Sequence, residues 1–166
     1  MSVHRASARF LAALLVAASV LGGGAASAAD KRPLPASAVF AVDGASRPLN
    51  QDAAQGQWLF IYLMPGSAVS TRLLDALRAW ELPSLQRLTI VVGGARADAA
   101  AFAAADHGLP GANWLLDPGR VAWADLQLTG VPTLLGVKDG AVEWKLAGVL
   151  NDPSALKAVV TIWLKP

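Results

Sequence analysis

Hydrophobic and polar positions follow two different periods along this chain. The apolar residues are continuous over 58–63 and 88–92, which is typical of short strands that are buried on both faces. Over 68–82 they recur every three or four residues, as Leu73 and Leu77 do, and this spacing predicts an amphipathic helix. The pattern therefore predicts strands that alternate with helices.

The remaining segments continue this alternation to the C-terminal end. Val142, Trp144 and Leu146 alternate with polar residues, which predicts a strand with one buried face. Asp152 and Pro153 match the first positions of a helix. In chain order, the predicted elements are a hairpin over 39–49, a strand over 58–63, a helix over 68–82, a strand over 88–92, an alanine-rich helix over 96–106, a strand over 113–116, helical turns over 121–128, a hairpin of strands 133–137 and 141–146, and a helix from 153.

This order predicts the fold class. Strands that are joined by helices pair in parallel, whereas the two strands of the last hairpin are antiparallel. We therefore expect an α/β protein: a three-layer α/β/α sandwich with a mixed central sheet and an N-terminal β-hairpin.

The first 28 residues have the pattern of an export signal. Arg5 and Arg9 precede an apolar run over 10–21, and the small residues at 26–28 match a cleavage site. The run is shorter than the roughly 20 residues that span a bilayer, so we favour a cleaved signal over an uncleaved anchor. We expect a signal peptide at 1–28, a flexible lead-in at 29–38 and an exported, periplasmic domain at 39–166.

Composition excludes several classes of function. The chain has no cysteine, which excludes structural disulfides and every reaction that needs a thiolate. Without Arg5 and Arg9, the 14 basic residues become 12, equal to the 12 acidic residues. Because no basic stripe is present, we expect no nucleic-acid partner. We also expect no membrane span after the signal.

Two serines lie at the predicted junction between the first buried strand and the helix that follows it, in the sequence Ser67-Ala68-Val69-Ser70. A serine at a helix N-terminus can act as a nucleophile, help to bind an anion, or simply cap the helix. A nucleophilic serine needs a base, and His107, the only histidine after the signal, is predicted to lie far away. We therefore favour capping and expect no catalytic residue.

The sequence carries no pattern of a metal or cofactor site. His107 has no second histidine or cysteine after the signal to complete a soft-metal site, so we interpret it as an exposed helix-end residue. The glycine run at 22–24 falls inside the signal, and no phosphate-binding loop follows it. We expect neither a metal nor a cofactor.

The order of the elements and several motifs resemble the thioredoxin superfamily over residues 39–166. The VDG, RPL and WLFIYL segments, the DPG turn and the GVPT loop occur in the order of its exported TlpA/ResA-type branch. The resemblance implies dithiol–disulfide exchange by a Cys-x-x-Cys motif, whose two cysteine positions match Ser67 and Ser70. Gly66 stands where an aromatic residue is common, and Ile61 matches an acidic residue that many members bury beneath the site.

The GVPT loop is the second half of the site that the resemblance implies. In the superfamily this loop presents a cis-proline beside the cysteines, and the backbone before the proline pairs with an extended peptide by strand addition. Val131, Pro132 and Thr133 match this loop, and Pro65 and Gly66 match the opposite wall of the expected binding groove. A purely structural turn is the alternative interpretation of Pro132.

Three functions remain open at this point. The first is a non-catalytic module that binds a protein or an extended peptide during envelope assembly or redox-protein maturation. The second is an enzyme with non-thiol chemistry at Ser67 or Ser70, and the third is a structural subunit of an envelope complex. Thiol–disulfide oxidoreductase activity is excluded because the chain has no cysteine.

Overall fold

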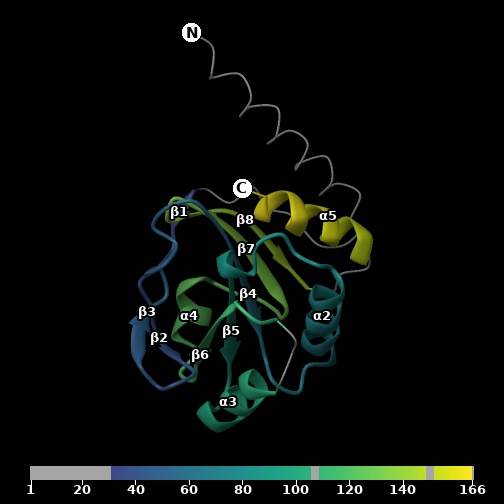
Figure 1. Ribbon diagram of the computed structural model, residues 1–166. Helices are drawn as coiled ribbons and strands as arrows, with labels where there is room; N and C mark the ends of the chain where they lie inside the picture. The colour runs from purple at the N-terminus through teal and green to yellow at the C-terminus, as the bar shows by residue number, and fades with distance from the viewer. Residues whose placement is uncertain (1–30, 106–108, 149–151, 166) are drawn as a thin grey trace.

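One mixed sheet forms the centre of the computed structural model, which describes residues 31–105, 109–148 and 152–165. Within these residues the sheet has eight strands in the spatial order β1-β8-β7-β4-β5-β6-β2-β3 (Figure 1). The strands are β1 (Arg32–Pro33), β2 (Ala38–Ala41), β3 (Ser46–Pro48), β4 (Gln57–Leu63), β5 (Leu88–Gly93), β6 (Asn113–Asp117), β7 (Thr133–Lys138) and β8 (Ala141–Ala147). The helices are α2 (Ala68–Ala79), the 3-10 turn η1 (Leu85–Arg87), α3 (Arg96–Ala104), α4 (Val121–Asp125) and α5 (Pro153–Leu164).

The pairing confirms that the sheet is mixed. Strands β4, β5 and β6 are parallel, because a helix or a helix with a turn connects each to the next. Strand β7 is antiparallel to both β4 and β8, and β2 is antiparallel to both β3 and β6. Both predicted hairpins are therefore present, and the first of them adds two strands beyond β6.

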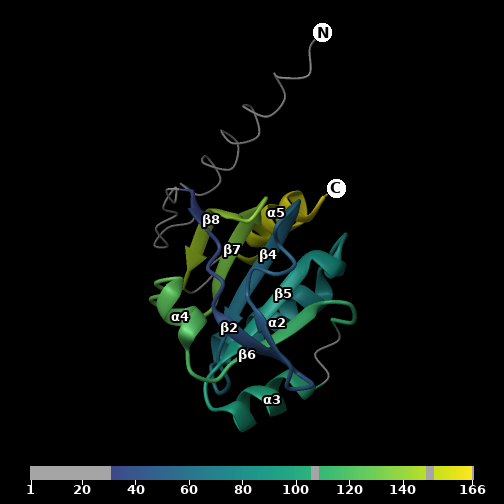
Figure 2. The same cartoon turned by 90° about the vertical axis from the view of Figure 1, so that its left-hand side faces the viewer.

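The continuous apolar run of β4 serves two cores at once. Leu59, Ile61 and Leu63 point into a cluster that also contains buried residues of α2, α3 and α5. Phe60 and Tyr62 point into a second cluster, to which α4 contributes. Figures 1 and 2 show α4 on one side of the sheet and α2 and α5 on the other, which gives the three expected layers.

Helix α2 is shorter than the sequence pattern predicts. It ends at Ala79, and Trp80 is its C-cap. Glu81 has a left-handed backbone with φ of 50°, so it cannot continue the helix. Pro83 two residues later also disfavours helical backbone before it. The apolar spacing alone overestimates the helix because it continues into the capping turn.

The other two middle helices are also shorter than predicted. α3 ends at Ala104 rather than near 106, and the predicted C-cap Gly108 lies outside the described residues. α4 ends at Asp125 rather than near 128, because Gln127 has a positive φ of 50°. The apolar positions after α4 face the core from a turn.

The predicted alternation in strand β8 is wrong in one respect: Val142 and Trp144 lie on opposite faces of the sheet. Val142 faces Val137, whereas Trp144 faces Gly136, so Glu143 is an extra residue at a β-bulge. A single extra residue reverses which face the following side chains take. Val142 therefore packs in the cluster with α4, and Trp144 packs in the cluster with α5.

Part of the lead-in expected to be flexible pairs with the sheet. Arg32 and Pro33 pair with β8, and the Leu34 amide donates to the Gly140 carbonyl at 2.8 Å. Leu34 and Ser37 are both buried. The proline and alanine content that suggested flexibility instead suits a short edge strand, where an absent amide is tolerated.

No helix in the described ranges is long and apolar enough to cross a bilayer.

Candidate functional site

The two serines cap helix α2. Ser67 is the N-cap residue, and its hydroxyl oxygen accepts from the Ser70 amide at 3.3 Å. The Ser70 hydroxyl in turn accepts from the Met64 amide at 3.3 Å. The first bond satisfies an amide that helix geometry leaves without a partner, and the second fixes the loop from Met64 to Ser67 onto the helix.

Within the described residues, neither serine hydroxyl forms a hydrogen bond to a basic side chain. Ser70 is fully buried, with 0% of its surface exposed. In the described part of the chain, each recorded hydrogen bond of the two hydroxyl groups joins a backbone amide. A serine nucleophile needs an adjacent base. His107 lies outside the described residues. Ala68 is exposed and Val69 is half-buried at the first turn.

The second segment of the expected site ends at strand β7. The Val131–Pro132 peptide bond is cis, and Pro132 is buried while Val131 is half-buried. The Thr133 hydroxyl donates to the Gly130 carbonyl at 2.6 Å, which closes the turn. Among the described residues, no hydrogen bond of the Val131 amide or carbonyl is recorded.

The sheet register brings these two segments together. Tyr62 of β4 faces Thr133 of β7 in an antiparallel pair. Met64 comes two residues after Tyr62 and Val131 two residues before Thr133, so both lie beyond the same end of the ladder. Both side chains pack against the same core cluster. We call residues 64–70 and 130–133 the loop pair, with 64–70 as its first wall and 130–133 as its second wall.

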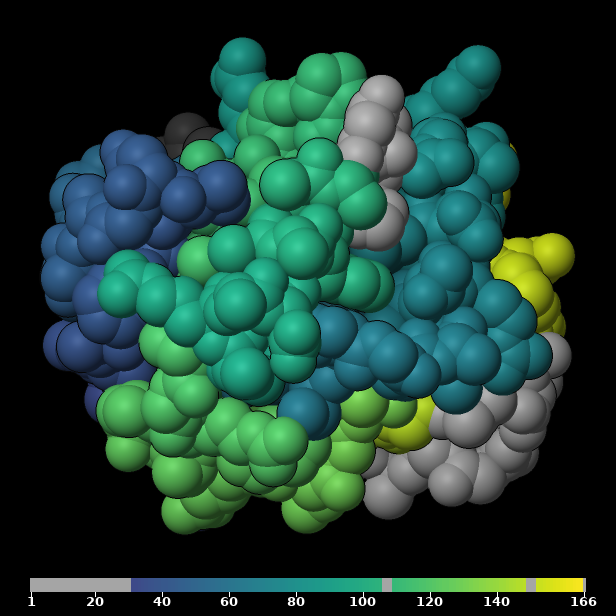
Figure 3. Space-filling view, turned by 90° about the horizontal axis from the view of Figure 1, so that it is seen from below, coloured from purple at the N-terminus to yellow at the C-terminus, as the bar shows by residue number. Residues whose placement is uncertain are grey.

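The loop pair presents an uncharged surface at one end of the sheet. None of its residues is ionisable, and Pro65, Gly66 and Ala68 are at least partly exposed. Figure 3 shows the start of α2 in teal at the surface of this end, near the green residues that include α4. Ile61, at the position matched to a buried acid, is fully buried in the apolar cluster.

Sequence reasoning missed a buried polar cluster beside the loop pair. The Tyr62 hydroxyl donates to Asp117 Oδ2 at 2.8 Å, and the Trp123 amide donates to the same oxygen at 3.1 Å. Asp117 is fully buried, and its other oxygen, Oδ1, has no partner among the described residues. In the sequence, Asp117 stands out only as the first residue of the DPG turn.

A signal for this cluster does exist in the sequence. Tyr62 is the only tyrosine of the chain and lies in a continuous apolar run, and a buried tyrosine hydroxyl usually finds a hydrogen-bond partner. Burial, and then the hydrogen bond and charge of Asp117, hold the pKa of Tyr62 well above its usual range. Gly93 leaves room for the ring, because a Cβ there would lie 2.2 Å from the hydroxyl.

No group of three His, Cys, Asp or Glu side chains that could hold a metal ion occurs within 31–105, 109–148 and 152–165.

Comparisons with known proteins give structural similarity only. No family model matches the chain, and no curated protein matches it. DsbF of Mycobacterium tuberculosis is similar in structure, with a TM-score of 0.63 and 15% identity over 78% of this chain and 96% of that chain. A secreted M. tuberculosis disulfide oxidoreductase homologous to E. coli DsbE has a TM-score of 0.57 and 16% identity, over 75% and 94% of the two chains.

A third similar structure is the thioredoxin domain of a thiol–disulfide oxidoreductase from Bacteroides vulgatus. It has a TM-score of 0.58 and 19% identity over 84% of this chain and 100% of that chain. Identities this low establish the fold and leave activity open. The layers, the mixed sheet and these neighbours agree. The chain therefore has a thioredoxin-like α/β fold, built without a single cysteine.

Proposed function

We propose that this chain is an exported, non-catalytic binding module that holds an extended segment of a protein partner against the loop pair. The observation that carries the proposal is the Val131 backbone. Its amide and carbonyl have no hydrogen-bond partner among the described residues, and it lies beyond the same end of the β4–β7 ladder as Met64.

Strand addition is the binding mode that suits this arrangement. An extended peptide beside Val131 would exchange main-chain hydrogen bonds with its amide and carbonyl, which supplies affinity without regard to side chains. Pro65, Val69 and Val131 would contact the peptide side chains, and no member of the loop pair carries a charge. We therefore expect the bound segment to be uncharged and to carry small apolar side chains.

The surroundings of the serines support binding over catalysis. The Ser67 and Ser70 hydroxyl groups accept hydrogen bonds that stabilise the loop and the first turn of α2. They therefore shape the first wall of the site. This role explains why two hydroxyl residues occupy the start of the helix without any requirement for turnover.

The proposed setting is the cell envelope, in assembly or in the maturation of redox proteins. The export pattern of residues 1–28 supports this setting. A module without thiols would present a partner to other proteins and would not reduce or oxidise it.

Site-specific photo-crosslinking in the native envelope tests the proposal. A photoreactive phenylalanine analogue replaces Val131, and a control probe replaces Asp98, which is exposed on α3. We expect one discrete adduct from the Val131 probe only, which mass spectrometry would identify. Equal adducts from both probes, or none from Val131, would contradict the proposal.

A further inference from the structure

We infer that Tyr62 and Asp117 are positioning residues that set the place of the Val131 segment relative to the first wall of the loop pair. The role in binding rests on the proposed function. The positioning of the Val131 segment can be tested without a partner. It concerns a buried hydrogen-bond cluster, and no residue of the cluster belongs to the loop pair.

The cluster begins on the strand that leads into the first wall. Tyr62 lies two residues before Met64 on β4, and its ring packs edge to face against Trp123 of α4, with centroids 5.4 Å apart. Its hydroxyl reaches across Gly93 of the intervening strand β5 to Asp117 at the end of β6. The Tyr62 side chain therefore contacts both α4 and the end of β6, from a position two residues before the first wall.

The connection continues from Asp117 toward the second wall through the backbone of α4. The Asp117 carbonyl accepts from the Arg120 amide at 3.1 Å, and its carboxylate accepts from the Trp123 amide. The Trp123 carbonyl then accepts from the Leu128 amide at 3.1 Å. Leu128 is buried and lies three residues before Val131. A continuous series of hydrogen bonds thus joins Tyr62 to Leu128, two residues before the second wall begins.

The burial of Asp117 makes this connection sensitive to a single hydroxyl group. Only the Tyr62 hydroxyl and the Trp123 amide donate to its carboxylate among the described residues, and Oδ1 has no partner there. When a buried polar group loses a hydrogen-bond partner, the free energy that it lost on leaving water is no longer compensated, and the fold is destabilised. Removal of the Tyr62 hydroxyl should therefore displace or loosen α4 without any change in the apolar packing of the ring.

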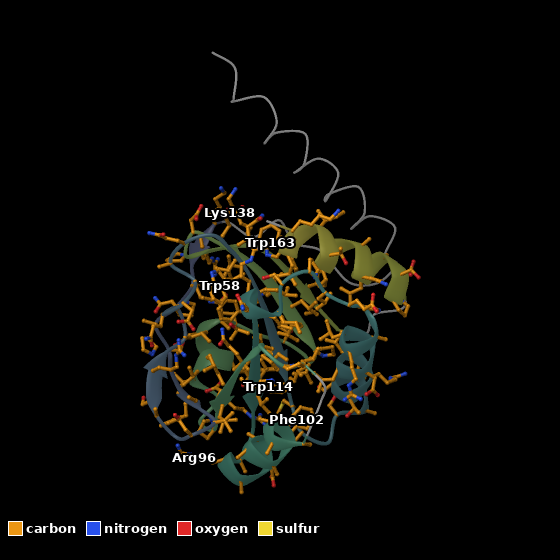
Figure 4. The ribbon with its side chains drawn as sticks, in the orientation of Figure 1. Trp58, Arg96, Phe102, Trp114, Lys138 and Trp163 are labelled. Carbon is orange, nitrogen blue, oxygen red and sulfur yellow. The ribbon has the colours of Figure 1, made fainter. Side chains whose placement is uncertain are left out.

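Hydrogen–deuterium exchange of the Tyr62→Phe protein tests the positioning directly. We expect exchange in residues 118–128 to rise about tenfold, because one of two donors to the carboxylate is lost. A matched control is Trp163→Phe, which removes a buried aromatic donor that bonds the Trp58 carbonyl at 2.9 Å. Figure 4 shows Trp58 and Trp163 at the end of the molecule near α5. Unchanged exchange in 118–128 of Tyr62→Phe would overturn the inference.

A double variant tests whether Tyr62 acts through Asp117. In the Asp117→Ala background, Tyr62→Phe should add no further rise in exchange of 118–128, because the acceptor is already gone. Equal, additive rises in both backgrounds would show that the hydroxyl acts independently and would overturn the inference.

Crosslinking then separates positioning from general loss of stability. In Tyr62→Phe, the adduct from a probe at Val131 should fall several-fold, and by a larger factor than the adduct from a probe at Ala68, because the serine caps still hold the first wall. A proportional loss at both positions would indicate a merely structural role and would contradict the inference. If the probes give no adduct even when Tyr62 is unchanged, the proposed function is contradicted. The exchange experiment alone then decides whether Tyr62 and Asp117 position the Val131 segment.

Discussion

At the scale of single residues, the central feature is a tyrosine that is held protonated inside an apolar core. Tyr62 is buried, and it donates to a carboxylate that is itself fully buried. Both conditions disfavour the tyrosinate, so burial first and Asp117 second raise the pKa of Tyr62 far above the ordinary value of 10.0. This shift makes the stability of the fold depend on pH in the alkaline range.

The sign of that dependence follows from proton counts. Below pH of about 10 the tyrosine is protonated in both states; above it the unfolded chain releases the proton and the folded chain retains it. Between pH of about 9 and 11, the free energy of unfolding should therefore fall by about 1.4 kcal/mol more in the protein with Tyr62 than in Tyr62→Phe. Urea unfolding of both proteins at the two pH values measures this difference. If the free energy of unfolding changes equally with pH in the two proteins, Tyr62 ionises normally in the folded chain.

Gly93 and Gly130 provide a matched pair of substitutions. A Cβ at Gly93 would lie 2.2 Å from the Tyr62 hydroxyl and 2.8 Å from two ring carbons, whereas nothing lies within 4 Å of a Cβ at Gly130. We expect Gly93→Ala to cost about 1–3 kcal/mol through overpacking, and Gly130→Ala to change stability by about 0.5 kcal/mol at most. Chemical denaturation of both proteins measures the costs. Equal costs would show that Tyr62 can move away from Gly93 freely.

At the scale of the elements, the helix starts are better specified by sequence than the helix ends. Asp152 and Pro153 occupy the N-cap and first position of α5 as their types predict. The ends of α2 and α4 were overestimated because apolar spacing continues through turns in which Glu81 and Gln127 take left-handed backbone. No local pattern indicates such a turn at a residue that is neither glycine nor asparagine.

The remaining misses arise from contacts that are distant in the sequence. Strand β1 forms because Arg32 and Pro33 meet β8, and the bulge at Glu143 appears only when β8 is paired with β7. The Tyr62–Asp117 bond likewise joins residues 55 positions apart. That residues 64–70 and 130–133 lie at the same end of the sheet is predicted only through the resemblance, because spacing alone does not bring two loops together.

The two side-chain N-caps give a prediction at this scale. The Ser67 hydroxyl accepts from one amide, whereas Asp152 Oδ1 accepts from the Ser154 and Ala155 amides at 2.9 and 3.1 Å. We expect Ser67→Ala to destabilise the fold by about 1 kcal/mol and Asp152→Ala by about 1–2 kcal/mol. Thermal and urea unfolding measure both costs. A negligible cost for Ser67→Ala would argue against capping and would reopen a chemical role for this serine.

At the scale of the whole molecule, the fold keeps two segments adjacent without any sulfur chemistry. The antiparallel pairing of β4 and β7 brings the two segments to the same end of the sheet. The serine hydroxyl groups bond the first segment, and the cluster around Asp117 bonds α4, whose Trp123 carbonyl bonds the Leu128 amide. Each of these devices is a hydrogen-bonded or packed contact within the domain. These contacts therefore do not depend on the redox environment.

The measurement that tests this account most directly is photo-crosslinking from both walls at once. Probes at Ala68 and Val131 are compared with one at Ile162, an apolar residue of α5 that is 51% exposed and lies outside the loop pair. The account predicts that the two loop-pair probes capture the same envelope protein, through one short segment, and that the Ile162 probe does not. Different proteins from the two walls, or the same protein from all three probes, would contradict it.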